Sequence, residues 1–164
     1  PGSPKEVSYP VYDGPPVVIP RLNVEGLSIL KPPYGIIAAI DMKKGEILWR
    51  LAHGETPDNV RNHPKLQGMD IPRTGQRGSV GMMVTKTLAI AGDMLVTNPG
   101  DRERGAMLRA YNKMTGEQVG EVWMPSRQSG SPMTYSVDGK QYIVVAVSGG
   151  SYVGEIRAYA LPDD

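Results

Sequence analysis

The chain has 164 residues, the size of one ordinary domain, and a formal net charge of +1 at pH 7. Basic and acidic residues are nearly equal in number, unlike the excess of basic residues typical of nucleic-acid-binding proteins, so nucleic acid is not an expected partner. The absence of cysteine excludes disulfides, thiolate metal sites and a cysteine nucleophile. The 20 glycines and 15 prolines interrupt the chain too often for long helices, and they favour a turn-rich β protein.

Residues 1–34 are studded with proline and contain one short β-branched run, 17–19. Because proline removes a backbone donor and fixes φ, this segment is predicted to be an extended strap with one edge strand. The chain begins with Pro1-Gly2-Ser3-Pro4, without methionine or an apolar signal core. We therefore expect a processed or shortened N-terminus and a piece of a larger protein.

Residues 35–164 are predicted to consist of β-hairpins. The first has strands at 35–41 and 46–51, and glycine occupies the turn position that favours positive φ. The same pattern recurs with strands at 106–112 and 117–123, and a third, truncated copy begins at residue 155. Four identities or close matches share one offset of 71 residues, which indicates an internal repeat: Ala39 with Ala110, Asp41 with Asn112, Gly45 with Gly116 and Glu46 with Glu117.

Two more hairpins are predicted between these copies. One pairs strands at 80–85 and 88–91, and the other pairs strands at 132–137 and 140–147 across an Asp138-Gly139 turn. The predicted fold class is therefore all-β: a partial β-propeller with about two four-stranded blades plus an incomplete hairpin. A closed propeller needs more blades, so we expect exposed sheet edges that another segment covers or through which the chain oligomerises.

Residues 52–77 interrupt the pattern as a long, polar, proline-rich inserted loop in which no helix is predicted. Imidazole and carboxylate groups gather here and can bind zinc or act as acid and base, but their spacing is irregular. The interpretation favoured over such a site is a hydrogen-bonded loop; the groups are His53, Glu55, Asp58 and His63. A second hypothesis is that this loop roofs a channel or meets an electron acceptor.

Two other clusters have simple structural interpretations. The run from Asp101 to Gly105 alternates in charge, which is typical of a solvated hairpin tip. Met82, Met83 and Met107 occupy strand positions without histidine or cysteine beside them, and they are interpreted as core residues.

The spacing Ala39-x-Asp41-x-x-x-Gly45-x-x-x-Trp49 resembles the tryptophan-docking motif of the quinoprotein dehydrogenases, whose eight-bladed propellers carry pyrroloquinoline quinone (PQQ). In this motif aspartate caps the turn, glycine takes the left-handed corner, and the indole packs between blades while its N–H finds a carbonyl. The second copy departs from the motif because Gly120 stands where the tryptophan belongs.

A longer string is more specific. Residues 129–150, with Ser-Gly-Ser-Pro-Met-Thr-Tyr at the start and Ser-Gly-Gly at the end, resemble the last full blade of PQQ-dependent glucose and alcohol dehydrogenases. Residues 158–164 are similar to the end of the membrane-bound glucose dehydrogenase type. The resemblance runs from about Leu30 to Asp164 and implies the C-terminal blades of an eight-bladed propeller.

The resemblance implies a function for the parent protein. It would oxidise an alcohol or an aldose such as glucose by hydride transfer to PQQ, with Ca²⁺ polarising the quinone, in the periplasm. Its implied partners are the upstream blades and, as electron acceptor, a quinone or cytochrome c. The alternative from another class is a non-catalytic quinoprotein-like propeller that acts as a protein–protein interaction scaffold.

The site residues implied by the resemblance are Gly149 and Gly150, whose turn contacts the quinone in the family. A tight turn with a purely structural role is the competing interpretation. The turn at 78–81 sits where relatives place a tryptophan or methionine. No catalytic or metal-binding residue is carried over, because the family's base, calcium ligands and stacking tryptophan lie upstream. The isolated chain is therefore expected to bind no cofactor and to be inactive.

Overall fold

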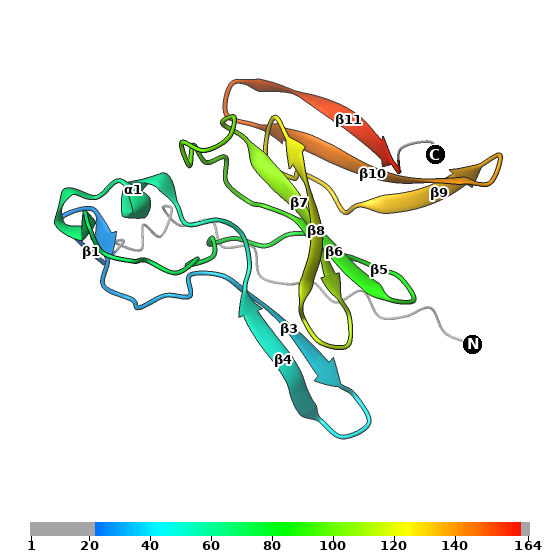
Figure 1. Ribbon diagram of the computed structural model, residues 1–164, viewed down its shortest axis with the longest axis horizontal. Helices are drawn as coiled ribbons and strands as arrows, with labels where there is room; N and C mark the ends of the chain where they lie inside the picture. The colour runs from blue at the N-terminus through cyan, green and yellow to red at the C-terminus, as the bar shows by residue number, and fades with distance from the viewer. Residues whose placement is uncertain (1–21, 162–164) are drawn as a thin grey trace, which may run out of the picture.

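The computed structural model describes residues 22–161, which form antiparallel β-sheets with little helix (Figure 1). The strand predicted at 17–19 lies outside the described residues. The elements, in chain order, are β1 Asn23–Val24, β2 Leu27–Ser28, β3 Ile36–Asp41, β4 Glu46–Ala52, α1 Asp58–Arg61, the 3-10 helix η1 Pro64–Leu66, β5 Met83–Val84, β6 Leu88–Gly92, β7 Ala106–Asn112, β8 Gln118–Met124, β9 Met133–Val137, β10 Lys140–Gly149 and β11 Tyr152–Ala160.

The strands form one four-stranded sheet in the order β5-β6-β7-β8, one three-stranded sheet in the order β11-β10-β9, and the hairpins β3-β4 and β1-β2. This arrangement confirms the all-β, partial-propeller prediction. Only one of the two expected four-stranded blades is complete among the described residues. The second sheet has three strands, because β11 pairs only with β10, and the hairpin β3-β4 has no further strand beside β3.

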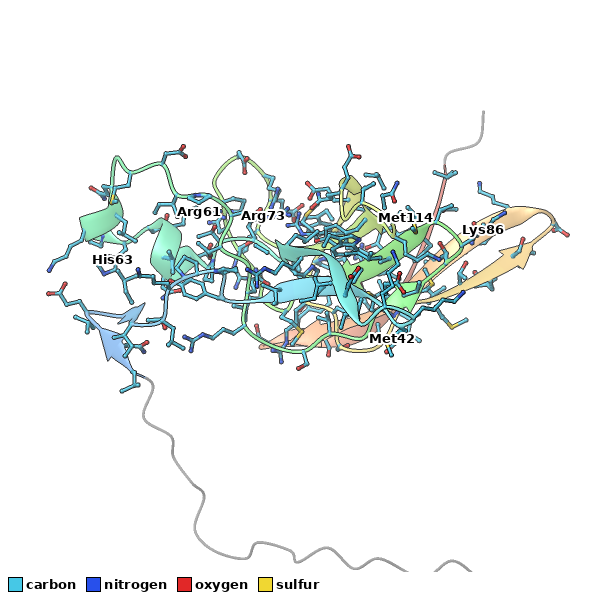
Figure 2. The ribbon with its side chains drawn as sticks, turned by 90° about the horizontal axis from the view of Figure 1, so that it is seen from below. Met42, Arg61, His63, Arg73, Lys86 and Met114 are labelled. Atoms are coloured by element: carbon cyan, nitrogen blue, oxygen red, sulfur yellow. The ribbon has the colours of Figure 1, made fainter. Side chains whose placement is uncertain are left out.

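The three larger sheets fan out from connecting loops that gather on the left of Figure 1, whereas their hairpin turns point the other way. Figure 2 shows the same division: Arg61, His63 and Arg73 come from the long loop at one end, and Met42, Lys86 and Met114 come from turns at the other. The molecule thus has a loop end and a turn end.

The predicted repeat is confirmed at the turns. Asp41 Oδ1 accepts hydrogen bonds from the backbone N–H groups two and three residues further on, at 2.9 and 3.3 Å. Asn112 Oδ1 does the same at 2.9 and 3.3 Å. Gly45 and Gly116, at φ 71° and 77°, close the two turns with N–H donors to the Asp41 and Asn112 carbonyls. Asparagine therefore replaces aspartate without changing the turn.

The repeat also includes a β-bulge. The pairing of β3 with β4 shifts after Ala39, which leaves Leu48 as the extra residue, and the pairing of β7 with β8 shifts after Ala110, which leaves Val119 extra. These positions again differ by 71 residues. Because a bulge changes which face the following side chains take, it sets the direction of the residue after it.

Both faces of the four-stranded sheet are covered. One face packs against the three-stranded sheet through a cluster of buried residues: Ile90, Ala106, Leu108, Met124, Val145 and Val147. The other face packs against hairpin β3-β4 through Ile37, Ala91 and Tyr111. Adjacent residues such as Ile90 and Ala91 point to opposite faces, as strand geometry requires. The sheets are therefore stacked face to face, as neighbouring blades are.

Trp49 makes the contact expected for it. Its Nε1–H donates to the Lys113 carbonyl at 3.0 Å, across to the turn of the four-stranded sheet. The indole lies over Gly116, where an added Cβ would meet the ring at 2.7 Å. Glycine is thus required at this turn both for its positive φ and for the close approach of the indole.

The second copy lacks this contact. Among the described residues, no atom lies within 4 Å of the position that a Cβ on Gly120 would occupy, and an apolar groove of about 860 Å³ runs past Gly120 between the four- and three-stranded sheets. Trp123 contacts the last sheet differently: Arg157 lies 5.7 Å from its ring centroid, and its carbonyl accepts a hydrogen bond from Tyr159 Oη at 2.9 Å.

We expect Gly120→Trp to stabilise the chain by about 1–2 kcal/mol, because it fills this groove with apolar surface and removes a glycine from a strand. Urea unfolding checks the change. Gly120→Ala is the matched control, since it restores strand propensity without filling the groove and is expected to gain about 0.5–1 kcal/mol. Equal stability of the two variants would contradict the prediction.

Three local predictions were wrong. The strand predicted over 80–85 is reduced to Met83–Val84, and the Thr85 hydroxyl caps the following turn by accepting from the Leu88 N–H at 3.0 Å. The long loop contains the short helices α1 and η1. The strap contains the hairpin β1-β2, whose turn residues Glu25 and Gly26 have φ of 52° and 85°, values that suit a two-residue hairpin turn.

Candidate functional site

A cleft of about 650 Å³ opens at the loop end, where the β6-β7, β8-β9 and β10-β11 connections meet α1. Gly149 and Gly150 form one wall. Gly149 has φ 143°, a backbone conformation that favours glycine, and the flexible Arg127 side chain lies against it, with Nε 2.5 Å from the position of an added Cβ. Gly150 has φ 61°, and no atom of residues 22–161 lies within 4 Å of an added Cβ, which leaves open space at this end of the turn.

Groups suited to an anion lie beside this turn. Ser126 is 1% exposed, and its buried Oγ has no hydrogen-bond partner among residues 22–161. Arg104 and Arg127 also line the cleft, and within the described chain neither guanidinium forms an ion pair. Asp58 is the one carboxylate in the lining, and both its oxygens accept from the Asn98 N–H at 2.9 and 3.1 Å. The lining is thus positively charged.

A second polar cluster is buried beside the cleft. Arg109, 1% exposed, binds both oxygens of Asp93, which is fully buried, through Nε at 2.8 Å and Nη2 at 3.1 Å. Its Nη1 donates to Glu121 at 2.5 Å. Burial alone would lower the pKa of Arg109, but the bonds to Asp93 and the charge of Glu121 raise it. The guanidinium is therefore charged and balanced by carboxylates.

The long loop joins this cluster through Glu55. Its carboxylate accepts from Arg102 and lies 3.5 Å from Arg61 and 3.7 Å from Arg109. Burial raises the pKa of Glu55, but the hydrogen bond from Arg102 and the charge of Arg109 outweigh it, and the net pKa is lowered. The interpretation of the loop as hydrogen-bonded is thus confirmed, whereas that of Arg102 as part of a solvated tip was wrong.

His53 belongs to the same buried region. Its Nε2 lies 3.1 Å from the Gly92 carbonyl, which only accepts, so Nε2 carries the hydrogen. Nδ1 then accepts from Tyr111 Oη at 3.0 Å. Burial lowers the pKa of His53, although the Gly92 carbonyl and Asp93 act in the opposite direction, and burial raises the pKa of Tyr111 to about 12. Both groups are neutral and structural.

The four candidate groups of the loop do not converge on one metal. His63 lies at the exposed end of the loop, where Nε2 bonds to the Glu25 carbonyl at 3.0 Å. Asp58 caps a backbone N–H and Glu55 pairs with arginines. Across the described part of the chain, no three His, Asp or Glu side chains are grouped as metal ligands.

We expect stability to fall as pH decreases from about 7 to about 5, by up to about 1.4 kcal/mol per pH unit. The unfolded chain protonates His53 near pH 6.5, whereas the folded chain, with its lowered pKa, resists protonation. Stability is therefore full above the unfolded pKa and is lost below it. Glu55, also with a lowered pKa, contributes a separate loss only below about pH 4.5.

Urea unfolding at several pH values measures this slope. His53→Gln is expected to remove it between about pH 7 and pH 5, and the control His63→Gln, at a half-buried histidine outside this cluster, is expected to keep it. An unchanged slope in His53→Gln would show that another group is responsible.

Stacked antiparallel sheets, a tryptophan docked on the neighbouring turn and loops gathered at one end define the class of β-propeller proteins. Comparison with family models gives the particular family: residues 5–143 match the PQQ family described as glucose/ethanol/alcohol dehydrogenase, beta-propeller domain. The chain belongs to this family of quinoprotein dehydrogenases.

Curated relatives agree with this assignment. The chain is 35% identical to a quinoprotein glucose dehydrogenase of Escherichia coli strain K12 over 152 residues, 88% of this chain and 18% of that protein. It is 31% identical to quinoprotein glucose dehydrogenase A of Acinetobacter calcoaceticus over 87% of this chain and 17% of the relative. It is 30% identical to a glycerol dehydrogenase large subunit of Gluconobacter oxydans strain 621H over 84% of this chain and 18% of that protein.

The chain therefore spans less than a fifth of the length of these bacterial relatives. Within residues 22–161, no helix has the length and apolar character needed to cross a bilayer.

The sequence identified the glycine turn of the cleft but not the residues that lie beside it. Gly149 and Gly150 were expected at a ligand contact, and the structure places them at the cleft. Ser126 and Arg127 were not singled out, because only the folded structure shows a hydroxyl without a partner and a guanidinium lying against the glycine turn.

Proposed function

We propose that this chain is the C-terminal part of a PQQ-dependent dehydrogenase that oxidises an alcohol or an aldose such as glucose. The observation that carries the proposal is the 35% identity with a quinoprotein glucose dehydrogenase over 88% of the chain. Relatives named for glucose and for glycerol support this substrate class. The reaction is proposed for the full-length protein, since the chain covers less than a fifth of these relatives.

The cleft fits PQQ, a planar ortho-quinone with three carboxylates. The Gly149-Gly150 turn permits close approach of a flat ring, and Ser126 offers a buried hydroxyl without a partner in the described chain. The arginines of the lining supply positive charge for carboxylates. When bound, PQQ supplies the hydride acceptor. The proposed role of this chain's residues is to hold and orient the cofactor at one edge.

The same region does not fit Ca²⁺. Calcium takes six to eight oxygen ligands, usually including free carboxylates. Asp58, the one carboxylate in the lining, accepts from the Asn98 N–H, and the carboxylates of Glu55, Asp93 and Glu121 are paired with Arg102 and Arg109. In this proposal the calcium ligands and the general base come from other parts of the full-length protein, and we assign no catalytic residue to this chain.

The principal partner in this proposal is the rest of the propeller. On hairpin β3-β4, Ile36, Ile40 and Ile47 are 53%, 54% and 60% exposed, and on β11 Val153 and Ile156 are 84% and 76% exposed. Apolar strand faces this open are typical of surfaces that another blade covers. The proposed location is the periplasm, and the proposed electron acceptor is a quinone or cytochrome c.

The test uses the full-length protein reconstituted with PQQ and Ca²⁺. We expect it to oxidise glucose, or an alcohol such as glycerol, with a dye as electron acceptor, and to need added PQQ. The 164-residue chain alone is expected to show no turnover. Binding of PQQ without oxidation of any sugar or alcohol would favour a non-catalytic scaffold, and absence of PQQ binding would refute the proposal.

A further inference from the structure

The cleft at the loop end contains one polar atom whose hydrogen-bonding capacity is unused. Ser126 is 1% exposed, and its Oγ makes no hydrogen bond within the described residues. A buried hydroxyl without a partner costs stability, so such groups are rare in native proteins. Ser126 belongs to the lining of a cleft of about 650 Å³, but its Oγ is closed to solvent, so a ligand in the cleft reaches the hydroxyl when the side chain turns toward the cleft.

The charges around this hydroxyl specify the kind of ligand. Arg127 follows Ser126 directly, and its side chain lies against the Gly149 turn, where an added Cβ would meet Nε at 2.5 Å. Arg104 stands in the same lining. Asp58 is the one carboxylate in the lining and forms no ion pair with Arg127 within the described chain, so a single negative charge faces two guanidinium groups. A hydroxyl and a guanidinium together bind a carboxylate or another oxyanion.

The size of the cleft favours an organic ligand. Its volume falls within the range of about 300–1,000 Å³ that is usual for organic ligands and cofactors. Gly150 leaves its own part of the wall without a side chain, which suits the approach of a flat molecule.

We propose that Ser126 and Arg127 bind a carboxylate of PQQ. The hydroxyl and the guanidinium each donate a hydrogen bond to it, and Arg104 adds positive charge at the cleft rim. This inference rests on the proposed function, because it assumes that PQQ is the cofactor of the full-length protein. It goes beyond that function by assigning recognition of one charged group to two residues of the β8-β9 connection.

The experiment measures the dissociation constant of PQQ with the full-length apoprotein by isothermal titration calorimetry. We expect Ser126→Ala and Arg127→Gln each to weaken binding by about 10- to 100-fold, the usual range for a hydrogen bond to a charged group. Arg77→Gln is the matched control: Arg77 donates to Ser28 Oγ at 2.5 Å outside the cleft, and this variant is expected to bind as the parent does.

A second ligand separates charge recognition from shape. PQQ trimethyl ester keeps the rings but lacks carboxylate charge, so it is expected to bind the parent protein more weakly than PQQ does. Arg127→Gln is expected to bind the ester no more weakly than the parent does, because the charge contact is already absent.

Ser126→Ala removes a hydroxyl that forms no bond in the described chain. Its melting temperature is therefore expected to be no lower than that of the parent protein.

The outcomes distinguish this inference from the proposed function. If the parent protein binds PQQ and both cleft variants bind it as tightly as Arg77→Gln, the inference is wrong and the proposed function stands. The inference is also refuted if the ratio of the dissociation constants of the ester and of PQQ is the same for Arg127→Gln as for the parent protein. If the parent protein binds no PQQ, the proposed function fails and the inference fails with it.

Discussion

Replacing Arg109 with methionine is expected to lower the free energy of unfolding by about 3–5 kcal/mol. Methionine matches the length of the side chain but leaves Asp93, which is fully buried and bound at 2.8 and 3.1 Å by the guanidinium, without a counter-charge. Glu121 and Glu55 lose the same partner. Urea unfolding of the chain measures the change.

Two further variants locate the cause of this loss. Lys65→Met breaks the exposed ion pair with Glu25 and is expected to cost less than about 1 kcal/mol, since solvent screens it. Combining Arg109→Met with Asp93→Asn removes both charges and is expected to recover part of the stability. A double variant less stable than Arg109→Met alone would show that the loss does not come from the unpaired carboxylate.

Replacing Trp49 with alanine is expected to cost about 3 kcal/mol, because it removes the half-buried indole that joins hairpin β3-β4 to the four-stranded sheet. Trp49→Phe keeps a ring but loses the bond to the Lys113 carbonyl, and a smaller loss of about 1 kcal/mol is expected. Urea unfolding checks both values. Equal losses in the two variants would assign the whole effect to the hydrogen bond.

The other side of this contact offers a matched pair of glycines. Gly116 and Gly139 have nearly the same φ, 77° and 78°, but only an alanine at 116 would meet the Trp49 ring. Gly139→Ala is expected to cost about 1 kcal/mol for the backbone alone. Gly116→Ala is expected to cost more, and the excess is expected to vanish when Trp49 is already alanine. An excess that persists in the Trp49→Ala background would contradict packing as its cause.

The hairpins were predictable because their signals are local. Gly45, Gly116 and the Asp138-Gly139 pair mark turns between alternating runs, and the structure places positive φ at each. The strand over 80–85 was overestimated because its apolar pattern suggests a longer element, whereas only Met83 and Val84 find partners on β6. Strand length depends on the neighbour as well as on the residues themselves.

The polar cluster and the cleft were less predictable because their partners are distant in sequence. Arg109 interrupts an apolar strand, which is a signal of a buried ion pair, but Asp93 lies 16 residues away and nothing local links the two. Gly149 and Gly150 were found through resemblance to a known family. Ser126 gave no sequence signal, since what marks it is the lack of a partner in the described fold.

The bulges at Leu48 and Val119 mark the positions where these strands can lose a residue without a change of register. If Leu48 were deleted, Ile47 and Trp49 would become neighbours and would still lie opposite Ile40 and Ala39, so the indole would keep its face and its place over Gly116. Deleting Arg50 instead would turn Leu51 and Ala52 to the opposite face. Single-residue deletions are therefore expected to be tolerated better at the two bulges than at the regularly paired positions of the same strands.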